Sequence, residues 1–141
     1  MFSPFHLALP VDDLDKARQF YTAAFNAKVG RSAERWIDFD FFGHQLSLHL
    51  NEESVIKTSH NQVDGDAVPV RHFGVILPWT QWHTLKNHLL NIQNIEIRWL
   101  IEPKIRFQGE VGEQATMFLL DPAQNAIELK SFQDPAQIFA H

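Results

Sequence analysis

Hydrophobic and polar residues follow two periods along the chain, and the same order of periods occurs twice. The first half opens with a strand-like apolar run at residues 5–10. A helical pattern follows, which Asp12 or Asp13 can cap and Asn26 can end. Its apolar residues recur every three or four positions: Leu14, Ala17, Phe20, Tyr21, Ala24 and Phe25. The first half therefore begins with a strand that leads into a helix.

Three strands are predicted after this helix. A short strand lies around Val29, and residues 36–42 alternate between apolar and polar side chains. Gly43 and His44 are typical of a tight turn, and residues 45–50 alternate again. The last two strands of the first half are thus predicted to form a hairpin.

The second half repeats this order. Residues 72–77 predict a strand, and Thr80 can cap the helical pattern that follows. Residues 95–101 are strand-like, and residues 117–120 and 126–132 predict a second hairpin. Two copies at a spacing of roughly 66 residues indicate duplication inside one domain. The predicted modules span about 1–52 and 70–133, with a polar connection over 53–69 and a tail over 134–141.

Composition narrows the classes of function. A chain of 141 residues with 45% hydrophobic content predicts one folded domain. A net charge of −5 without a Lys/Arg cluster argues against a nucleic-acid or anionic-membrane surface. The chain has no cysteine, which leaves histidines and carboxylates as the available metal ligands. No signal peptide or membrane-spanning run is recognisable, which predicts a cytoplasmic protein.

Three residues in strand-like runs form a candidate metal site. His6 and His72 occupy matching places at the openings of the two halves, and Glu128 lies in the last strand-like run. Two imidazoles and one carboxylate are the ligands of facial metal sites that keep open coordination positions. A single histidine in a strand is more often structural, but a carboxylate inside an apolar strand is costly unless it is paired or coordinated. The combination favours a metal site over three unrelated structural residues.

Further candidates lie on the strand over residues 45–50. Superposing the two halves places Ser47 opposite Glu128, and Gln45, Ser47 and His49 share one face because strand side chains alternate. If Ser47 matches Glu128, that face is directed at the metal. His49 is then a candidate acid/base or fourth ligand, since an imidazole titrates near neutral pH. Gln45, Ser47 and Arg106 are candidate substrate-binding residues, although an arginine in such a position is more often just a surface charge.

Three segments resemble the vicinal oxygen chelate superfamily, which includes glyoxalases, extradiol dioxygenases, fosfomycin-resistance enzymes and bleomycin-binding proteins. They are Phe5–Leu14, Ala17–Tyr21 and Phe118–Leu129. The resemblance implies an α+β fold of two tandem βαβββ modules, which form a curved mixed sheet around a divalent metal. It also implies that His6, His72 and Glu128 are the ligands. A fourth ligand, a Glu in glyoxalases, would fall at or near Ser47.

Ser47 is a poor metal ligand. The three-ligand arrangement of the dioxygenase and fosfomycin-resistance branches therefore fits this sequence better than the four-ligand arrangement of the glyoxalases. Asp38–Ser47 and Gly112–Thr116 further resemble small bacterial proteins described as glyoxalase- or dioxygenase-like. We therefore expect a dioxygenase-like enzyme with one divalent ion, Fe(II) being favoured and Zn, Ni, Mn or Co being alternatives. The expected substrate is a small molecule with adjacent oxygens, and a homodimer is expected.

Three other functions remain open from the sequence. They are a glyoxalase-like isomerase or lyase, transfer of a thiol or water onto an epoxide antibiotic, and a metal-free protein that binds an antibiotic or metabolite. Bleomycin-binding relatives lack the metal ligands, so the presence of His6, His72 and Glu128 argues against the last of these. The epoxide branch has a basic pocket assisted by potassium, which the sequence does not clearly show.

Overall fold

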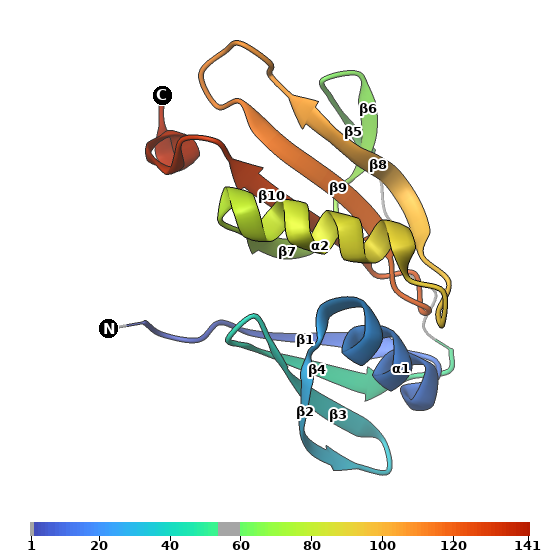
Figure 1. Cartoon of the computed structure of the whole chain (residues 1–141). Helices are drawn as coiled ribbons and strands as arrows, with labels where there is room; N and C mark the ends of the chain where they lie inside the picture. The colour runs from blue at the N-terminus through green and yellow to red at the C-terminus, as the bar shows by residue number, and fades with distance from the viewer. Residues whose placement is uncertain (1, 54–59) are drawn as a thin grey trace. The chain divides into compact units, whose positions relative to one another are not determined.

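The computed structural model describes residues 2–53 and 60–141, which form two compact units (Figure 1). The first unit contains the elements up to residue 50, together with Ile92–Glu96 and Asp121–Asn125. The second unit contains the elements from residue 60 onward. Each unit is built on its own four-stranded sheet.

The first unit has the order strand, helix and three strands. Its elements are β1 (His6–Val11), α1 (Leu14–Phe25), β2 (Lys28–Ala33), β3 (Trp36–Phe41) and β4 (His44–Leu50). The sheet order is β1-β4-β3-β2, in which β1 and β4 are parallel and the other pairs are antiparallel. The predicted hairpin of β3 and β4 is therefore confirmed.

The ends of α1 follow the sequence signals. The side chain of Asp13 accepts a hydrogen bond from the backbone N–H of Lys16 at 2.9 Å, so Asp13 is the N-cap. Asn26 has φ of 53°, the left-handed conformation in which short polar side chains often end a helix. Local chemistry alone thus fixes both ends of this helix.

The second unit repeats the same topology. Its elements are β7 (Phe73–Ile76), α2 (Trp79–Asn91), β8 (Arg98–Arg106), β9 (Gln114–Leu120) and β10 (Ala126–Phe132). The sheet order is β7-β10-β9-β8, again with a parallel pair followed by antiparallel pairs. The duplication and the α+β class of two βαβββ modules are confirmed.

The strand registers confirm which positions of the two modules are equivalent. In the first module Ala8, two residues after His6, pairs with Ser47. In the second module Gly74, two residues after His72, pairs with Glu128. Ser47 therefore occupies the place in its module that Glu128 occupies in the other.

Several predicted boundaries differ from the structure, and two segments contain elements that the sequence did not predict. Strand β8 runs over Arg98–Arg106 rather than 95–101, and α2 begins at Trp79, so Thr80 is not its cap. The predicted connection contains a hairpin of β5 (His60–Val63) and β6 (Asp66–Pro69), while its residues 54–59 lie outside the described residues. The predicted tail contains a short 3-10 helix, η1, over Pro135–Phe139. The hairpin and the extension of β8 depend on contacts with each other, described below, which no local pattern reveals.

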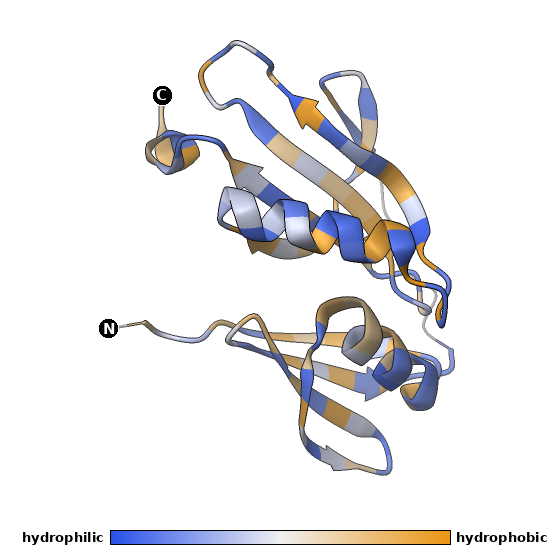
Figure 2. Ribbon diagram, viewed as in Figure 1, coloured by the Kyte–Doolittle hydropathy of each residue, from blue (hydrophilic) through white to orange (hydrophobic). Residues whose placement is uncertain are grey.

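The faces of the second sheet differ in polarity because strand side chains alternate. Met117, Leu119, Ile127 and Leu129 are 0% exposed and make up one face. Helix α2 packs against β10, and its buried Trp82 donates from Nε1 to the backbone oxygen of Leu129 at 2.8 Å. Figure 2 shows the mixture of hydrophobic and hydrophilic residues along the strands and along α2. The opposite face carries Thr116, Glu128 and Lys130, and is the one that concerns function.

Tyr21 holds a buried carboxylate in the first unit. Its hydroxyl donates to Asp121 Oδ2 at 2.8 Å, and both side chains are 0% exposed. We expect Tyr21→Phe to lower the free energy of unfolding by about 1–3 kcal/mol, because the change leaves a buried acceptor without one donor while keeping the ring. Urea denaturation measures the loss. Thr22→Ala, which removes an exposed helix hydroxyl, is the control and should change stability by less than about 0.5 kcal/mol.

Candidate metal centre

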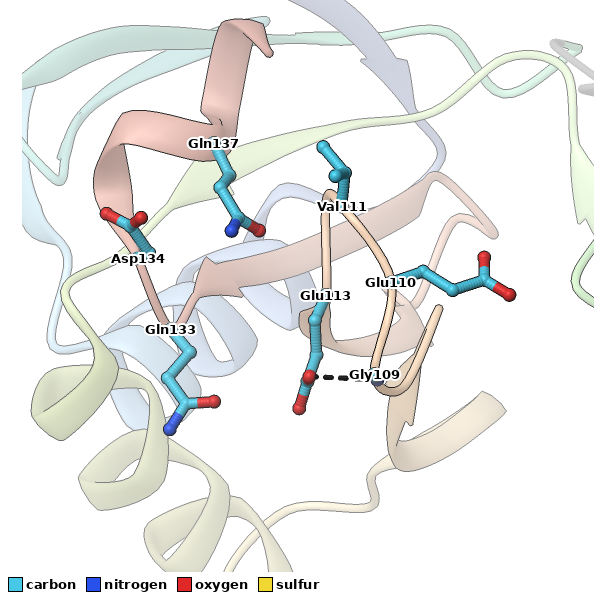
Figure 3. A pocket seen from close by; sticks show the side chains of 7 residues that line it. All are labelled: Gly109, Glu110, Val111, Glu113, Gln133, Asp134 and Gln137. Carbon is cyan, nitrogen blue, oxygen red and sulfur yellow. Dashed lines mark hydrogen bonds between the residues drawn. The ribbon is translucent and has the colours of Figure 1, made fainter. Parts of the chain in front are cut away.

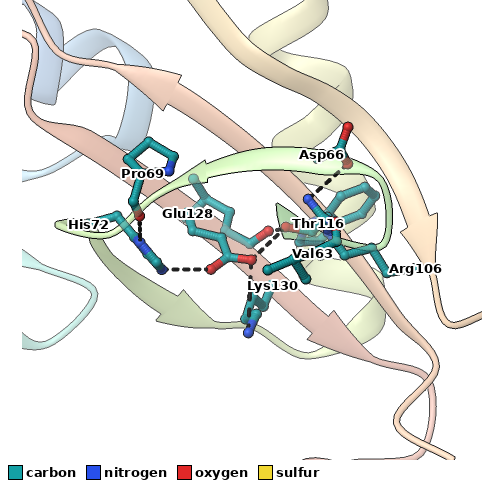
Figure 4. Close-up of polar contacts among 10 residues, drawn as sticks. Val63, Asp66, Pro69, His72, Arg106, Thr116, Glu128 and Lys130 are labelled. Carbon is teal, nitrogen blue, oxygen red and sulfur yellow. Dashed lines mark hydrogen bonds and ion pairs between the residues drawn. The ribbon is translucent and has the colours of Figure 1, made fainter. Parts of the chain in front are cut away.

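His72 and Glu128 are paired on the polar face of the second sheet (Figure 4). Glu128 lies in the middle of β10, with its side chain 9% exposed. His72 immediately precedes β7, the strand parallel to β10, and its side chain is 30% exposed. His72 Nε2 lies 3.3 Å from Glu128 Oε2. The parallel pairing of the first and last strands of the module thus brings together two of the three predicted ligands.

Neighbouring side chains keep Glu128 ionised. Thr116 donates its hydroxyl to Glu128 Oε1 at 2.8 Å, and Lys130 Nζ lies 3.9 Å from the same oxygen. Burial raises the pKa of the Glu128 carboxyl, but the bond to His72, the charge of Lys130 and the Thr116 hydroxyl outweigh it and lower the pKa below its ordinary value. The group is therefore a carboxylate at neutral pH, the form that binds a cation.

The orientation of the His72 ring is set by its other nitrogen. Nδ1 lies 2.6 Å from the backbone oxygen of Pro69, the last residue of β6. Because a carbonyl oxygen only accepts, Nδ1 carries the hydrogen and Nε2 is left facing Glu128. Imidazoles that bind metals almost always donate their second N–H in this way. The hydrogen bond with Glu128 raises the pKa of His72, although partial burial acts in the opposite direction. The proton between His72 Nε2 and Glu128 Oε2 thus lies where a divalent cation could bind instead.

The ring of His6 in the first unit is oriented in the same way, through a hydrogen bond at Nδ1. It begins β1, is exposed, and its Nδ1 lies 2.8 Å from Gln45 Oε1. The amide of Gln45 donates from Nε2 to Asp38 Oδ2 at 3.3 Å, which fixes its carbonyl oxygen toward the histidine. His6 therefore also carries a hydrogen on Nδ1, which leaves Nε2 as the nitrogen that could bind a metal.

The predicted ligands are divided between the two units. His72 and Glu128 meet in the second unit, and His6 belongs to the first. Among the residues that the structure describes, no group of three or more His, Asp or Glu side chains gathers at one point. The donor types, the hydrogens on Nδ1 of the two histidines and the anionic state of Glu128 nevertheless fit a divalent metal. The three-residue ligand set stays a prediction.

Gln45 and Ser47 share one face of β4 and both contact Asp38. The Ser47 hydroxyl donates to Asp38 Oδ1 at 2.5 Å, and Ser47 is buried. His49 is exposed on the same strand, opposite Pro10 of β1 and Trp36 of β3. The substrate-binding roles of Gln45 and Ser47 and the acid/base role of His49 stay predictions. The contacts of Gln45 and Ser47 show that both are also part of the polar network beside His6.

Arg106 has a structural role that the sequence did not indicate. It is 1% exposed rather than a surface charge. Its guanidinium donates to the backbone oxygen of Val63 and lies 3.0 Å from Asp66 Oδ2, while Lys104 Nζ lies 2.9 Å from the same oxygen. These contacts attach the β5–β6 hairpin to β8, and the hairpin in turn supplies the Pro69 oxygen that orients His72. The prediction that Arg106 binds substrate is untested.

Neither His72 nor Glu128 lines either of two hollows found among the described residues. One, of about 410 Å³, is formed by the loop after β8 and by η1, and its lining includes Glu110, Glu113 and Asp134 (Figure 3). The other, of about 380 Å³, is lined by Asp38, Gln45 and neighbouring residues of the first unit. Only the second contains a predicted site residue, since Gln45 lines it.

A family model described as the Glyoxalase/Bleomycin resistance protein/Dioxygenase superfamily matches residues 3–129. The chain belongs to this superfamily. The match runs from before His6 to just after Glu128, so it spans the whole of the predicted ligand set. A comparison with curated protein sequences found no match.

Solved structures of the superfamily share the fold. A glyoxalase/bleomycin resistance protein/dioxygenase from Alicyclobacillus acidocaldarius is 30% identical, with a TM-score of 0.80, and the match covers 97% of this chain and 96% of that one. The fosfomycin resistance protein FosX from Listeria monocytogenes is 19% identical over 97% and 98% of the chains, with a TM-score of 0.67. Lactoylglutathione lyase from Agrobacterium tumefaciens is 17% identical over 99% and 97%, with a TM-score of 0.62. The last two establish fold alone.

Three partners of the site were missed by the sequence analysis. They are the Pro69 oxygen, the Thr116 hydroxyl and the Asp38 carboxylate. Thr116 carried a usable signal, because it lies two residues before Phe118, which pairs with Glu128, and so shares the polar face. Within residues 2–53 and 60–141, the helices are too short or too polar to span a bilayer.

Proposed function

We propose that this chain is a metal-dependent enzyme of the vicinal oxygen chelate type. The observation that supports it most directly is the His72–Glu128 pair, in which His72 Nε2 and a carboxylate oxygen lie 3.3 Å apart, while His72 Nδ1 and the other carboxylate oxygen already have hydrogen-bond partners in Pro69 and Thr116. His6, with its Nδ1 bonded to Gln45, supplies the third ligand. A second copy of the chain in the proposed homodimer is an alternative source of that histidine.

The residues of the site would hold one divalent ion and leave part of its coordination sphere open. Such an ion acts as a Lewis acid on a substrate that offers two adjacent oxygens. His72 and His6 would each bind the ion through Nε2, because Pro69 and Gln45 accept the hydrogen on Nδ1. Thr116 holds Glu128 in one orientation through Oε1. His49 would exchange a proton with the substrate from the exposed face of β4.

A dioxygenase-like reaction with Fe(II) is the form of the proposal we favour. The position equivalent to Glu128 in the first module is Ser47, which is neutral and donates its hydroxyl to Asp38. A serine in that state is a poor fourth ligand, so three protein ligands remain, the number typical of non-haem Fe(II) oxygenases. A glyoxalase-like isomerase or lyase that uses Zn, Ni, Mn or Co is the alternative.

Elemental analysis of protein purified without chelator tests the proposal. About one metal per chain is expected, and iron accompanied by oxygen consumption with a substrate that offers two adjacent oxygens supports the dioxygenase-like form. Zinc or nickel with isomerase or lyase activity would instead support the glyoxalase-like form. A protein that contains no metal and does not bind added Fe, Mn, Ni or Zn would contradict the enzyme proposal and favour a metal-free binding protein.

Gln45 should tune the metal affinity through His6. We expect Gln45→Leu to weaken binding of Mn(II) by about tenfold, because loss of the oxygen that accepts from Nδ1 frees the imidazole to rotate and change tautomer. Isothermal titration calorimetry with the metal measures the change. Gln19→Leu, on the exposed face of α1 in the same unit, is the matched control and should bind Mn(II) like the wild type. Equal affinities for all three proteins would remove His6 from the ligand set.

A further inference from the structure

Lys130 is a cation on the functional face that the proposed metal chemistry does not use. It lies two residues after Glu128 on β10, so both side chains project from the same face of the sheet. Its Nζ approaches Glu128 Oε1, whereas His72 approaches Oε2 (Figure 4). His72 and Lys130 thus approach different oxygens of the same carboxylate.

Lys130 is held more loosely than the other cations of this face. Its nitrogen lies 3.9 Å from Glu128, close to the outer limit of an ion pair, and its side chain is 33% exposed. Lys104 and Arg106 lie 2.9 and 3.0 Å from Asp66 and are occupied in attaching the β5–β6 hairpin. An ammonium at the longer distance keeps donors available for a further partner.

The charges on this face then favour an anionic ligand. Asp66 offsets one of the two positive charges of Lys104 and Arg106. The single negative charge of Glu128 would have to offset both the charge of Lys130 and that of the proposed metal ion. A divalent ion beside Glu128 leaves an excess of positive charge, which a neutral chelator would not reduce. A ligand that brings one negative charge within reach of Lys130 gains a charge-assisted hydrogen bond.

We propose that Lys130 forms an anion subsite, and that the substrate is a small monocarboxylate with an oxygen on the adjacent carbon, such as a 2-hydroxy or 2-oxo acid. This inference rests on the proposed metal-dependent function. The carboxylate and its neighbouring oxygen supply the two adjacent oxygens, and Lys130 recognises the charge. Lys130 is therefore a specificity-determining residue rather than a metal ligand.

Glycolate and its uncharged analogue glycolamide test the subsite, because they differ only in the charged group. Their binding to Mn(II)-loaded protein is measured by the relaxation of water protons, which reports displacement of metal-bound water without any turnover. We expect Lys130→Gln to weaken glycolate binding by about tenfold and glycolamide binding by less than about twofold. Lys130→Arg should retain most of the glycolate affinity.

Two controls separate this subsite from a structural role and from the metal site itself. Lys86→Gln removes the same charge from α2, which packs on the other face, and should leave glycolate binding unchanged. Mn(II) affinity of Lys130→Gln should stay equal or rise by up to about threefold, because a neighbouring cation has been removed. A lower Mn(II) affinity would mean that Lys130 only supports Glu128, and would overturn the inference.

The remaining outcomes are distinct. Wild-type protein that binds Mn(II) but does not prefer glycolate to glycolamide, or whose preference survives Lys130→Gln, overturns the anion subsite and leaves the proposed metal-dependent function standing. Wild-type protein that binds no Mn(II) overturns the proposed function, and the subsite falls with it.

Discussion

Glu128→Gln is expected to reduce the affinity for a divalent metal by more than about 100-fold, because loss of a ligand exceeds the roughly 10- to 100-fold effect of losing a hydrogen-bond partner of a ligand. The substitution keeps the size of the side chain and can still accept from Thr116 at one oxygen. It removes the negative charge that faces His72 Nε2. His72→Ala should have an equally large effect. Metal content after purification without chelator, and titration with Mn(II), measure both losses.

Two matched variants test whether removing any carboxylate charge or any histidine lowers the metal affinity. Glu102→Gln neutralises an exposed carboxylate on β8 of the same sheet, and His83→Ala removes an imidazole from α2. Both should bind metal like the wild type. Circular dichroism of all four variants establishes that they are folded. Retention of stoichiometric metal by folded Glu128→Gln protein would show that the ion is bound elsewhere.

Gly74→Ala is expected to lower the free energy of unfolding by about 3 kcal/mol or more. Gly74 pairs with Glu128 across the parallel strands β7 and β10, and a Cβ added to it would overlap the backbone oxygen of Glu128 and lie 2.6 Å from its carbonyl carbon. Backbone atoms in a paired strand cannot rotate away as a flexible side chain can. Urea denaturation measures the loss, and because His72 immediately precedes β7, metal affinity should fall as well.

Gly30→Ala is the control that separates crowding from a general effect of replacing glycine in a strand. A Cβ on Gly30 would meet Asp38 at 3.5 Å, an ordinary contact. This substitution should therefore change stability by less than about 1 kcal/mol, and restriction of the unfolded chain favours a small gain. Similar stabilities of the two variants would show that β7 and β10 can separate at Gly74 without loss.

The sequence by itself determined the features that depend on local periodicity and local capping. The α1 boundaries follow from Asp13 and Asn26, and the β3–β4 hairpin follows from strict alternation on both sides of a Gly-containing turn. The repeated order of strand and helix revealed the duplication, and the matching of Ser47 to Glu128 followed from it. Such features can be predicted from the sequence because each residue involved acts on neighbours only a few positions away.

Only the tertiary structure decided which polar groups serve the site residues. Nothing local marks Pro69 as the acceptor for His72, because its role depends on the β5–β6 hairpin, which is attached through Asp66 to Arg106 about 40 residues later in the chain. The same is true of Asp38, which joins Gln45 to Ser47 only because β3 lies beside β4. The expectation that Arg106 is a surface charge was wrong for the same reason, since the side chain is buried. An isolated charged residue is typical of a surface, whereas a buried one needs partners, and those of Arg106 come from the distant β5–β6 hairpin.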